Sequence, residues 1–256
     1  NSNNSNNSNN SNNSNNSNNK NNLNKIDHPL AQYVFHRINN KNIILFNKDN
    51  ADTINYDNIY IDCFFNKLVD ILNFSFERER EYHISTGSYS PGYKHNIDTI
   101  KNNLNNSRMT AHILCNETLE PISFLYLENN ENDYDKLYTM CTDNKYRNKG
   151  MGSLLLNNMI TNQLNNKRNK MILEVYNDKE IGRNKTDILQ NHIVNLFSSK
   201  GFKETPKENI TEYARNNLVS HINGTKIMTL DPKLFIKKNN NEMKNLNTIG
   251  KTYCCN

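Results

Sequence analysis

The stretch Tyr146-Arg147-Asn148-Lys149-Gly150-Met151-Gly152-Ser153 decides how this chain is expected to fold. It lies between a strand-like run, Leu137 to Thr142, and a run with helical apolar spacing, Met151 to Leu164. Glycine tolerates tight turns and allows another molecule to approach the main chain closely. A helix start also leaves N–H groups without intrahelical acceptors at the positive end of the helix dipole. The stretch therefore predicts a turn that binds a phosphate or pyrophosphate, with Arg147 and Lys149 adding positive charge.

Two other glycine motifs do not fit this stretch. A P-loop needs the pattern G-x-x-x-x-G-K-S/T, and neither its spacing nor its Lys-Ser/Thr end is present here. A dinucleotide-binding fingerprint needs a third glycine, but Gly150-Met151-Gly152 is followed by leucines at 154 and 155. The remaining alternative is an ordinary glycine-containing turn between a strand and a helix.

Hydrophobic periodicity predicts the other elements around the turn. Helices are expected at Cys63–Phe76, Ile97–Leu104 and Asp187–Ser199, and strands at Asn42–Phe46, Met109–Cys115, Pro121–Leu127, Lys170–Val175 and Lys226–Leu230. In the first of these helices Phe64, Leu68, Ile71, Leu72 and Phe76 should face inward, and in the last Leu189, Ile193, Leu196 and Phe197 should do so. The strands on either side of the Met151–Leu164 helix should be parallel, because such a crossover is right-handed.

Composition divides the chain into three parts. Residues 1–19 repeat Asn and Ser without an apolar side chain, so they cannot offset the entropy cost of ordering. We expect a disordered tract at 1–25, one folded domain at 26–235 and a disordered Asn/Lys-rich tail at 236–256.

Charge and cysteine content limit the possible partners. The net charge of +5 is scattered, and no basic run interleaved with aromatic residues indicates nucleic acid as a partner. No stretch approaches the length of an apolar transmembrane helix, and no signal peptide is visible. The five cysteines, including the terminal pair Cys254 and Cys255, lack metal-ligand spacing. They favour free thiols in a reducing, cytoplasmic compartment, with no metal.

The order of elements resembles the GCN5-related N-acetyltransferases, the GNAT superfamily, over about Ile59 to Pro232. The resemblance rests on three antiparallel strands, the R-x-x-G-x-G turn, a helix, a parallel strand and a second helix ending in Lys200-Gly201-Phe202. It implies an α/β (α+β) fold whose mixed, mostly antiparallel sheet contains a βαβ acetyl-CoA-binding core flanked by helices.

The same resemblance implies where acetyl-CoA would bind. Its pantetheine arm would run along the strand residues Met140, Cys141 and Thr142, pairing with backbone groups of Met140 and Thr142. Its pyrophosphate would be held by the backbone N–H groups from Arg147 to Gly152 and by the Ser153 hydroxyl. The binding residues of the turn are therefore Arg147, Asn148, Lys149, Gly150, Met151, Gly152 and Ser153.

This chain differs from the family pattern at the residue that donates a proton to the leaving group. Many members place a Tyr before K-x-G-F to protonate the leaving thiolate, but counting back from Gly201 puts Phe197 at that position. Phenylalanine cannot donate a proton. The thiolate would leave unassisted, or water or the Ser198 hydroxyl would protonate it.

The catalytic base is also altered. Several branches keep a Glu or His an even number of residues before Thr142, and this chain has Lys136 and Tyr138 there, while Asp135 has the wrong parity. Glu174 in Leu173-Glu174-Val175 is similar to the Glu that serves as base in the ribosomal-protein alanine acetyltransferase branch. Glu174 is thus the first catalytic candidate and Tyr138 the second, while a surface role for Glu174 remains open.

These residues predict an enzyme that moves an acetyl group from acetyl-CoA to a primary amine. The acceptor, a small amine, a peptide or a protein, cannot be identified from the sequence. The alternative is a non-catalytic module of the same fold that binds an acyl-CoA, which the missing Tyr and the missing strand base favour.

Overall fold

A computed structural model of the chain describes residues 28–77, 94–130, 134–165, 170–175, 187–216 and 226–231. The expected terminal tracts at 1–25 and 236–256, and with them the outer limits of the predicted domain, lie outside these residues.

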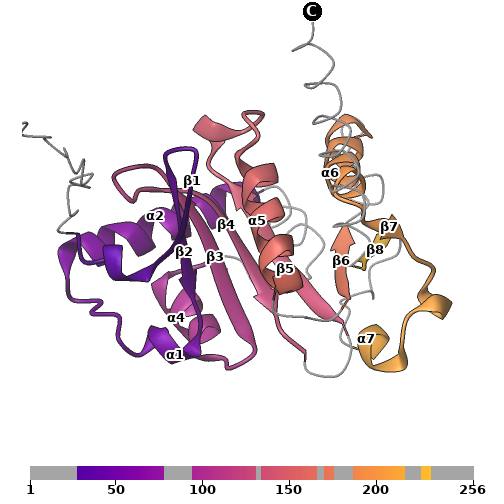
Figure 1. Cartoon of the computed structure of the whole chain (residues 1–256), viewed down its shortest axis with the longest axis horizontal. Helices are drawn as coiled ribbons and strands as arrows, with labels where there is room; N and C mark the ends of the chain where they lie inside the picture. The colour runs from indigo at the N-terminus through magenta and orange to yellow at the C-terminus, as the bar shows by residue number, and fades with distance from the viewer. Residues whose placement is uncertain are drawn as a thin grey trace, which may run out of the picture.

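One mixed sheet of eight strands forms the centre of the described structure, in the order β1-β2-β3-β4-β5-β6-β8-β7 (Figure 1). Neighbours are antiparallel except β5 and β6, which pair in parallel as the crossover rule predicts. The strands are β1 (Val34–Ile38), β2 (Lys41–Phe46), β3 (Met109–Cys115), β4 (Pro121–Glu128), β5 (Asp135–Thr142), β6 (Met171–Val175), β7 (Lys203–Glu204) and β8 (Lys226–Leu230).

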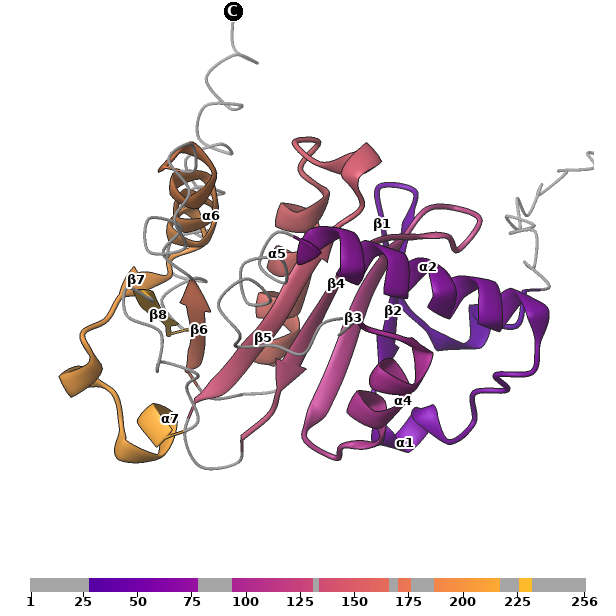
Figure 2. The ribbon, with the colours of Figure 1, turned by 180° about the vertical axis from the view of Figure 1, so that it is seen from behind.

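Helices cover both faces of the sheet. They are α1 (Lys48–Ala51), α2 (Ile59–Ser75), α4 (Ile97–Asn105), α5 (Met151–Asn165), α6 (Asp187–Ser199) and α7 (Glu212–Asn216), with short 3-10 turns η1 (Ala31–Tyr33), η2 (Asn144–Tyr146) and η3 (Lys207–Asn209). Figure 2 shows α2 and α4 on the face turned away from α5.

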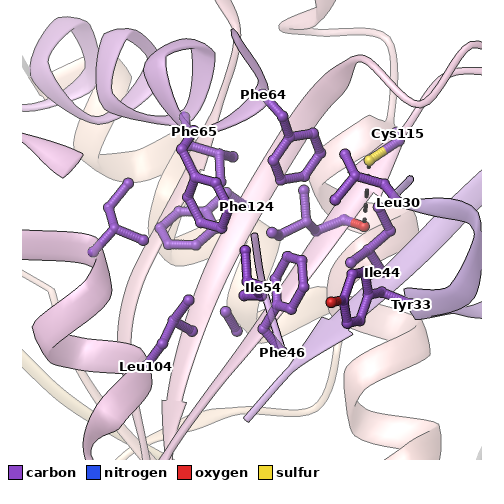
Figure 3. Packing of buried hydrophobic residues seen from close by; sticks show 14 of the residues in the cluster. Leu30, Tyr33, Ile44, Phe46, Ile54, Phe64, Phe65, Leu104, Cys115 and Phe124 are labelled. Atoms are coloured by element: carbon purple, nitrogen blue, oxygen red, sulfur yellow. Dashed lines mark hydrogen bonds between the residues drawn. The ribbon is translucent and has the colours of Figure 1, made fainter. Parts of the chain in front are cut away.

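Each face of the sheet has its own apolar core. Under α2 and α4, aromatic side chains pack together, with Phe46 lying between Tyr33, Phe64 and Phe65 (Figure 3). The second core lies under α5 and receives Phe197 from α6. The predicted inward face of α2 is confirmed, because Phe64, Leu68, Ile71 and Leu72 are buried and Phe76 is packed against the core. On α5, the apolar residues Leu155, Leu156, Met159 and Ile160 are buried.

The predictions differ from the structure at some places. Ile193 does not face inward; it is 40% exposed, whereas Phe197 one turn later is buried. The strand β1 was not predicted, because its short run Val34–Ile38 is mostly exposed and lacks an apolar alternation. Phe65 was also missed, since it lies beside the stripe that a strict helical count selects, yet it is fully buried.

The strands β5 and β6 pair only over a short length. Their register joins residues 135 to 137 of β5 with residues 171 to 173 of β6, and the strands then diverge (Figures 1 and 2). The remaining part of β5, from Tyr138 to Thr142, is paired on the β4 side alone among the described strands. The sheet is therefore open at the end of β5 that leads into the glycine turn.

Candidate functional site

The glycine turn connects β5 to α5 through two left-handed residues. Asn148 has φ of 59° and Gly150 has φ of 78°, which reverse the chain before α5 begins at Met151. The N–H of Leu154 donates to the carbonyl of Gly150 at 2.9 Å, which makes this bond the first of the helix. The N–H groups of Met151, Gly152 and Ser153 precede it and have no intrahelical acceptor. The predicted anion-binding helix start is therefore present in geometry.

Gly152 is required by packing between α5 and β5. A Cβ atom at this residue would lie 2.9 Å from Met140 Cε and 3.1 Å from Thr142 Oγ1. The Met140 methyl group ends a flexible side chain and can move aside, whereas the Thr142 oxygen has to give by a few tenths of an ångström, so a side chain here presses the helix start against the strand. Gly150, in contrast, has open space around it and is needed for its positive φ. The two glycines thus act in different ways.

Backbone groups of Met140 and Thr142 face the open edge of β5. The N–H of Asp143 donates to the carbonyl of Ile122 on β4 at 2.9 Å, and Ser123 Oγ donates to the carbonyl of Cys141 at 2.8 Å. Alternate residues of a strand direct their backbone groups to opposite edges, so residues 140 and 142 point away from β4. This is the edge that β6 does not reach. An extended ligand could pair there as an added strand.

A β-bulge in β5 lies where its pairing with β6 ends. Tyr126 of β4 pairs with Thr139 and Leu127 pairs with Leu137, so Tyr138 is the extra residue. The bulge exchanges the two faces of the strand: Leu137 packs in the core under α5 before it, and Met140 does so after it. Because of the bulge, every second residue counted back from Thr142 no longer lies on one face of β5 beyond Tyr138. The prediction that used this count to judge which residues of the strand could be the catalytic base was therefore wrong.

Glu174 forms an ion pair with Lys136 at the fork between β5 and β6. Lys136 Nζ lies 3.2 Å from Glu174 Oε2, and less than a tenth of each side chain is exposed. Glu174 is the first residue of β6 beyond its parallel pairing with β5, and Tyr138 is the corresponding residue of β5. Lys136 Nζ also lies 4.8 Å from the centre of the Tyr138 ring. The structure thus brings both candidate catalytic residues to the fork and adds a cation between them.

This pair changes the chemistry expected of Glu174. A buried carboxylate is costly unless it is paired, and Lys136 supplies the partner. Asp135, one residue before Lys136, accepts a hydrogen bond from the N–H of Asn130 at 2.8 Å and has a structural role. The sequence had placed Glu174 on an apolar strand without identifying this partner.

Arg147 is directed toward α2 and β5. Its Nε donates to the carbonyl of Thr142 at 3.1 Å, and its Nη2 donates to Ser75 Oγ at 3.1 Å. The guanidinium also lies 5.1 Å from the centre of the Phe74 ring. The backbone N–H of Arg147 donates to the carbonyl of Asn144 at 3.3 Å. The guanidinium and the backbone N–H of Arg147, which were expected to bind a pyrophosphate, thus both donate hydrogen bonds within the protein.

The other turn residues are exposed or partly accessible to solvent. Asn148 and Lys149 are exposed, and Lys149 Nζ lies 5.7 Å from the Tyr146 ring centre. Met151, Gly152 and Ser153 are partly accessible at the helix start. The N–H groups of these three residues and the Lys149 ammonium lie where they could bind an anion.

Asp143 fixes the beginning of the turn and was not identified from the sequence. Its carboxylate is 2.6 Å from Lys67 Nζ of α2 and accepts a hydrogen bond from the N–H of Lys145 at 3.0 Å. Burial would raise the pKa of Asp143, but the hydrogen bonds from Lys67 and Lys145 outweigh it and hold the pKa below its ordinary value. The same contact raises the pKa of Lys67.

Phe197 is part of the core and not of the fork surface. It is 7% exposed and packs against Phe202, with ring centres 5.5 Å apart. Gly201, with φ of 89°, ends the helix, and Phe202 N–H returns to the carbonyl of Phe197 at 3.1 Å. Ser198 lies on the exposed side of α6. Phe197 therefore serves packing, and the Ser198 hydroxyl faces solvent.

Metal sites and membrane-spanning helices can be assessed within the described ranges. No group of three or more His, Cys, Asp or Glu side chains there is placed to hold a metal ion. Within the same ranges, none of the helices combines the length and the apolar character that crossing a membrane requires.

The described structure is an α/β protein with a βαβ unit formed by β5, α5 and β6, in which the start of α5 lies beside the edge of β5 that β6 leaves unpaired. No family model and no curated protein matches the chain. Solved structures do. A GNAT-family acetyltransferase from Staphylococcus aureus is similar at 16% identity, over 75% of this chain and 99% of that one, with a TM-score of 0.47.

Two further structures show the same kind of similarity. An acetyltransferase from Streptococcus agalactiae is 16% identical, over 75% of this chain and 98% of that one, with a TM-score of 0.49. An N-acetyltransferase from Thermoplasma acidophilum in complex with coenzyme A is 14% identical, over 73% and 97%, with a TM-score of 0.42. The observed strand order, glycine turn and parallel crossover agree with the mixed α/β fold that the sequence predicts.

Proposed function

We propose that this protein is an N-acetyltransferase that moves an acetyl group from acetyl-CoA to a primary amine. The observation that carries this proposal is the open edge of β5 at Met140 and Thr142, directly beside the glycine turn and the start of α5. An extended arm and a pyrophosphate are the two chemical parts that such an edge and such a turn accept together. Acetyl-CoA contains both.

The pyrophosphate would meet the N–H groups from Asn148 to Gly152, the Ser153 hydroxyl and the Lys149 ammonium. The arm would follow residues 142 and 140 toward the bulge at Tyr138, which brings the thioester to the fork. Glu174 lies at this fork and would remove a proton from the acceptor ammonium. The neutral nitrogen attacks the carbonyl carbon, the C–N bond forms and the C–S bond breaks.

The coenzyme thiolate leaves with the bonding electrons, the nitrogen loses its second proton to water to give the amide, and the thiolate takes up a proton from water. A thiol with an ordinary pKa of about 8.5 is a good leaving group without an acid beside it. This accounts for a fold in which Phe197 takes the place of a proton donor and is used for packing. Removal of the amine proton is then the step that most needs the protein, because an amine with a pKa of about 10.4 is almost fully charged at pH 7.

A second function is a non-catalytic module that binds acyl-CoA. It is favoured by the Lys136–Glu174 ion pair, since the Lys136 ammonium already occupies the carboxylate oxygen Oε2 that an acceptor ammonium would have to reach. The two functions share the coenzyme and differ in turnover.

The test combines binding with turnover. Titration calorimetry should show acetyl-CoA binding to the wild-type chain, and a panel of amines should then produce amine-dependent release of free CoA thiol. Binding without release from any amine would favour the module, and the absence of binding would refute both functions.

A further inference from the structure

Arg147 joins three parts of the molecule that are distant in the sequence. It belongs to the glycine turn, its Nη2 reaches Ser75 at the last residue of α2, and its Nε reaches the carbonyl at the end of β5. The guanidinium also lies over the ring of Phe74. A guanidinium has a planar set of five donors and stacks on aromatic rings, so a single arginine can make all these contacts together.

Ser75 links the same contact to the strand. Burial raises the pKa of the Cys141 thiol to about 12, and a hydrogen bond with Ser75 opposes this shift. Ser75 therefore lies between the Cys141 side chain of β5 and the guanidinium of Arg147. The end of α2 is seated on both the strand and the turn that would hold the coenzyme.

A second contact between α2 and the turn lies two helical turns earlier. Lys67 reaches Asp143 at the first residue after β5. The turn is thus attached to α2 at its beginning through Asp143 and in its middle through Arg147. These two attachments fix its position relative to a rigid helix, as preorganised binding requires.

We propose that Arg147 is a positioning residue, which aligns the glycine turn and the Thr142 carbonyl for the coenzyme through Ser75 and Phe74, and is not itself a ligand of the pyrophosphate. This inference rests on the proposed function. A carbonyl oxygen has two lone pairs, so the Thr142 carbonyl can keep its bond to Arg147 and still accept one from the pantetheine arm. Charge recognition of the pyrophosphate then falls to Lys149 and the N–H groups of the turn.

The experiment compares two ligands, acetyl-CoA and acetyl-pantetheine, which has the arm and the thioester but no diphosphate. The variants are Arg147→Lys, which keeps the charge but loses the planar fork, Ser75→Ala, and Lys149→Ala as the matched control in the same turn. Affinities are measured by calorimetry or by competition. Amide hydrogen exchange of the turn is measured in the absence of ligand.

A positioning role predicts that Arg147→Lys weakens both ligands by a similar factor of about ten, the factor expected for the loss of one hydrogen bond to a charged group. Ser75→Ala should weaken both in the same direction, and the double variant should lose less than the product of the two factors. Exchange of the turn amides should be faster in both. Lys149→Ala should weaken acetyl-CoA alone and leave exchange unchanged.

A loss in Arg147→Lys that is confined to acetyl-CoA, with Ser75→Ala unchanged for both ligands, would overturn the inference and make Arg147 a phosphate ligand. Unchanged turn exchange in Arg147→Lys would overturn it as well. Wild-type protein that binds neither ligand would refute the proposed function, and the exchange measurement would then still decide whether Arg147 holds the turn.

Discussion

Replacement of Gly152 tests whether the contact between α5 and β5 forms the coenzyme site. In Gly152→Val, the Cβ atom would lie 2.9 Å from Met140 Cε and 3.1 Å from Thr142 Oγ1. The Met140 methyl group can move, but the Thr142 oxygen lies close to the backbone, so the helix start and the strand must separate slightly. Overpacking of this kind costs about 1–3 kcal/mol in folding free energy. Valine has a better helix propensity than glycine, which offsets roughly 0.3–0.5 kcal/mol of this cost.

The expected result is a folded variant with a melting temperature lower by roughly 2–10 °C, since 1 kcal/mol shifts a domain of this size by about 2–4 °C. Acetyl-CoA affinity should fall more than about tenfold, equal to 1.4 kcal/mol or more. The reason is that the displaced residues, Met140 and Thr142, form the open edge along which the arm would lie. Calorimetry and thermal melting measure the two quantities on the same preparation.

Gly150→Ala is the matched control. Its Cβ would meet no atom within 4 Å, but its φ of 78° is unfavourable for alanine. A left-handed non-glycine residue costs about 1–2 kcal/mol, which gives a similar loss of stability without pressure on β5. The loss of acetyl-CoA affinity should therefore be clearly smaller than in Gly152→Val. Folded Gly152→Val with wild-type affinity would refute the coenzyme site, and equal losses in both variants would refute the overlap as its cause.

Four other variants test separate parts of the structure. Glu174→Gln should lower turnover about 10²-fold or more with little change in acetyl-CoA affinity, because its proposed role is proton removal, and an unaffected rate in steady-state assays would exclude it as the base. Phe197→Tyr should leave turnover unchanged but lower stability by about 1–3 kcal/mol, measured by denaturant unfolding, since the hydroxyl enters a packed core away from the fork; a fully stable variant would mean that the hydroxyl finds a partner there. Burial lowers the pKa of His112 to about 4, so the unfolded chain takes up a proton first as pH falls below about 6.5, and the free energy of unfolding of wild type should fall by roughly 3 kcal/mol by pH 4. His112→Leu should lack this part of the pH dependence, and an equal fall in the free energy of unfolding of the two proteins between pH 7 and pH 4 would contradict the prediction. Because the pKa of Asp143 is lowered, its ion pair with Lys67 stabilises the fold above about pH 4, and this stabilisation is lost as pH falls further. The difference in melting temperature between wild type and Lys67→Met should therefore shrink in acid, and a difference that stays constant with pH would refute a stabilising role for this ion pair.

Most of the order of elements and the position of the turn follow from the sequence alone, although β1 and β7 do not. Strand alternation, the helical stripe of α5 and the two glycines are local features, and each is specified within a few residues of the chain. The parallel pairing of β5 and β6 followed from a general rule of chirality. The structure confirms these features, and with them the mixed sheet that was expected.

Only the tertiary structure decided how the candidate site is arranged. The bulge at Tyr138 exchanges the faces of β5, and it arises from pairing with β4, which no alternation within β5 reveals. Lys136 and Glu174 are 38 residues apart, while Ser75 and Arg147 are 72 residues apart, and neither contact has a local signature. Such contacts depend on where the sheet and α2 place their side chains, since a charged residue finds its partner in space and not along the chain.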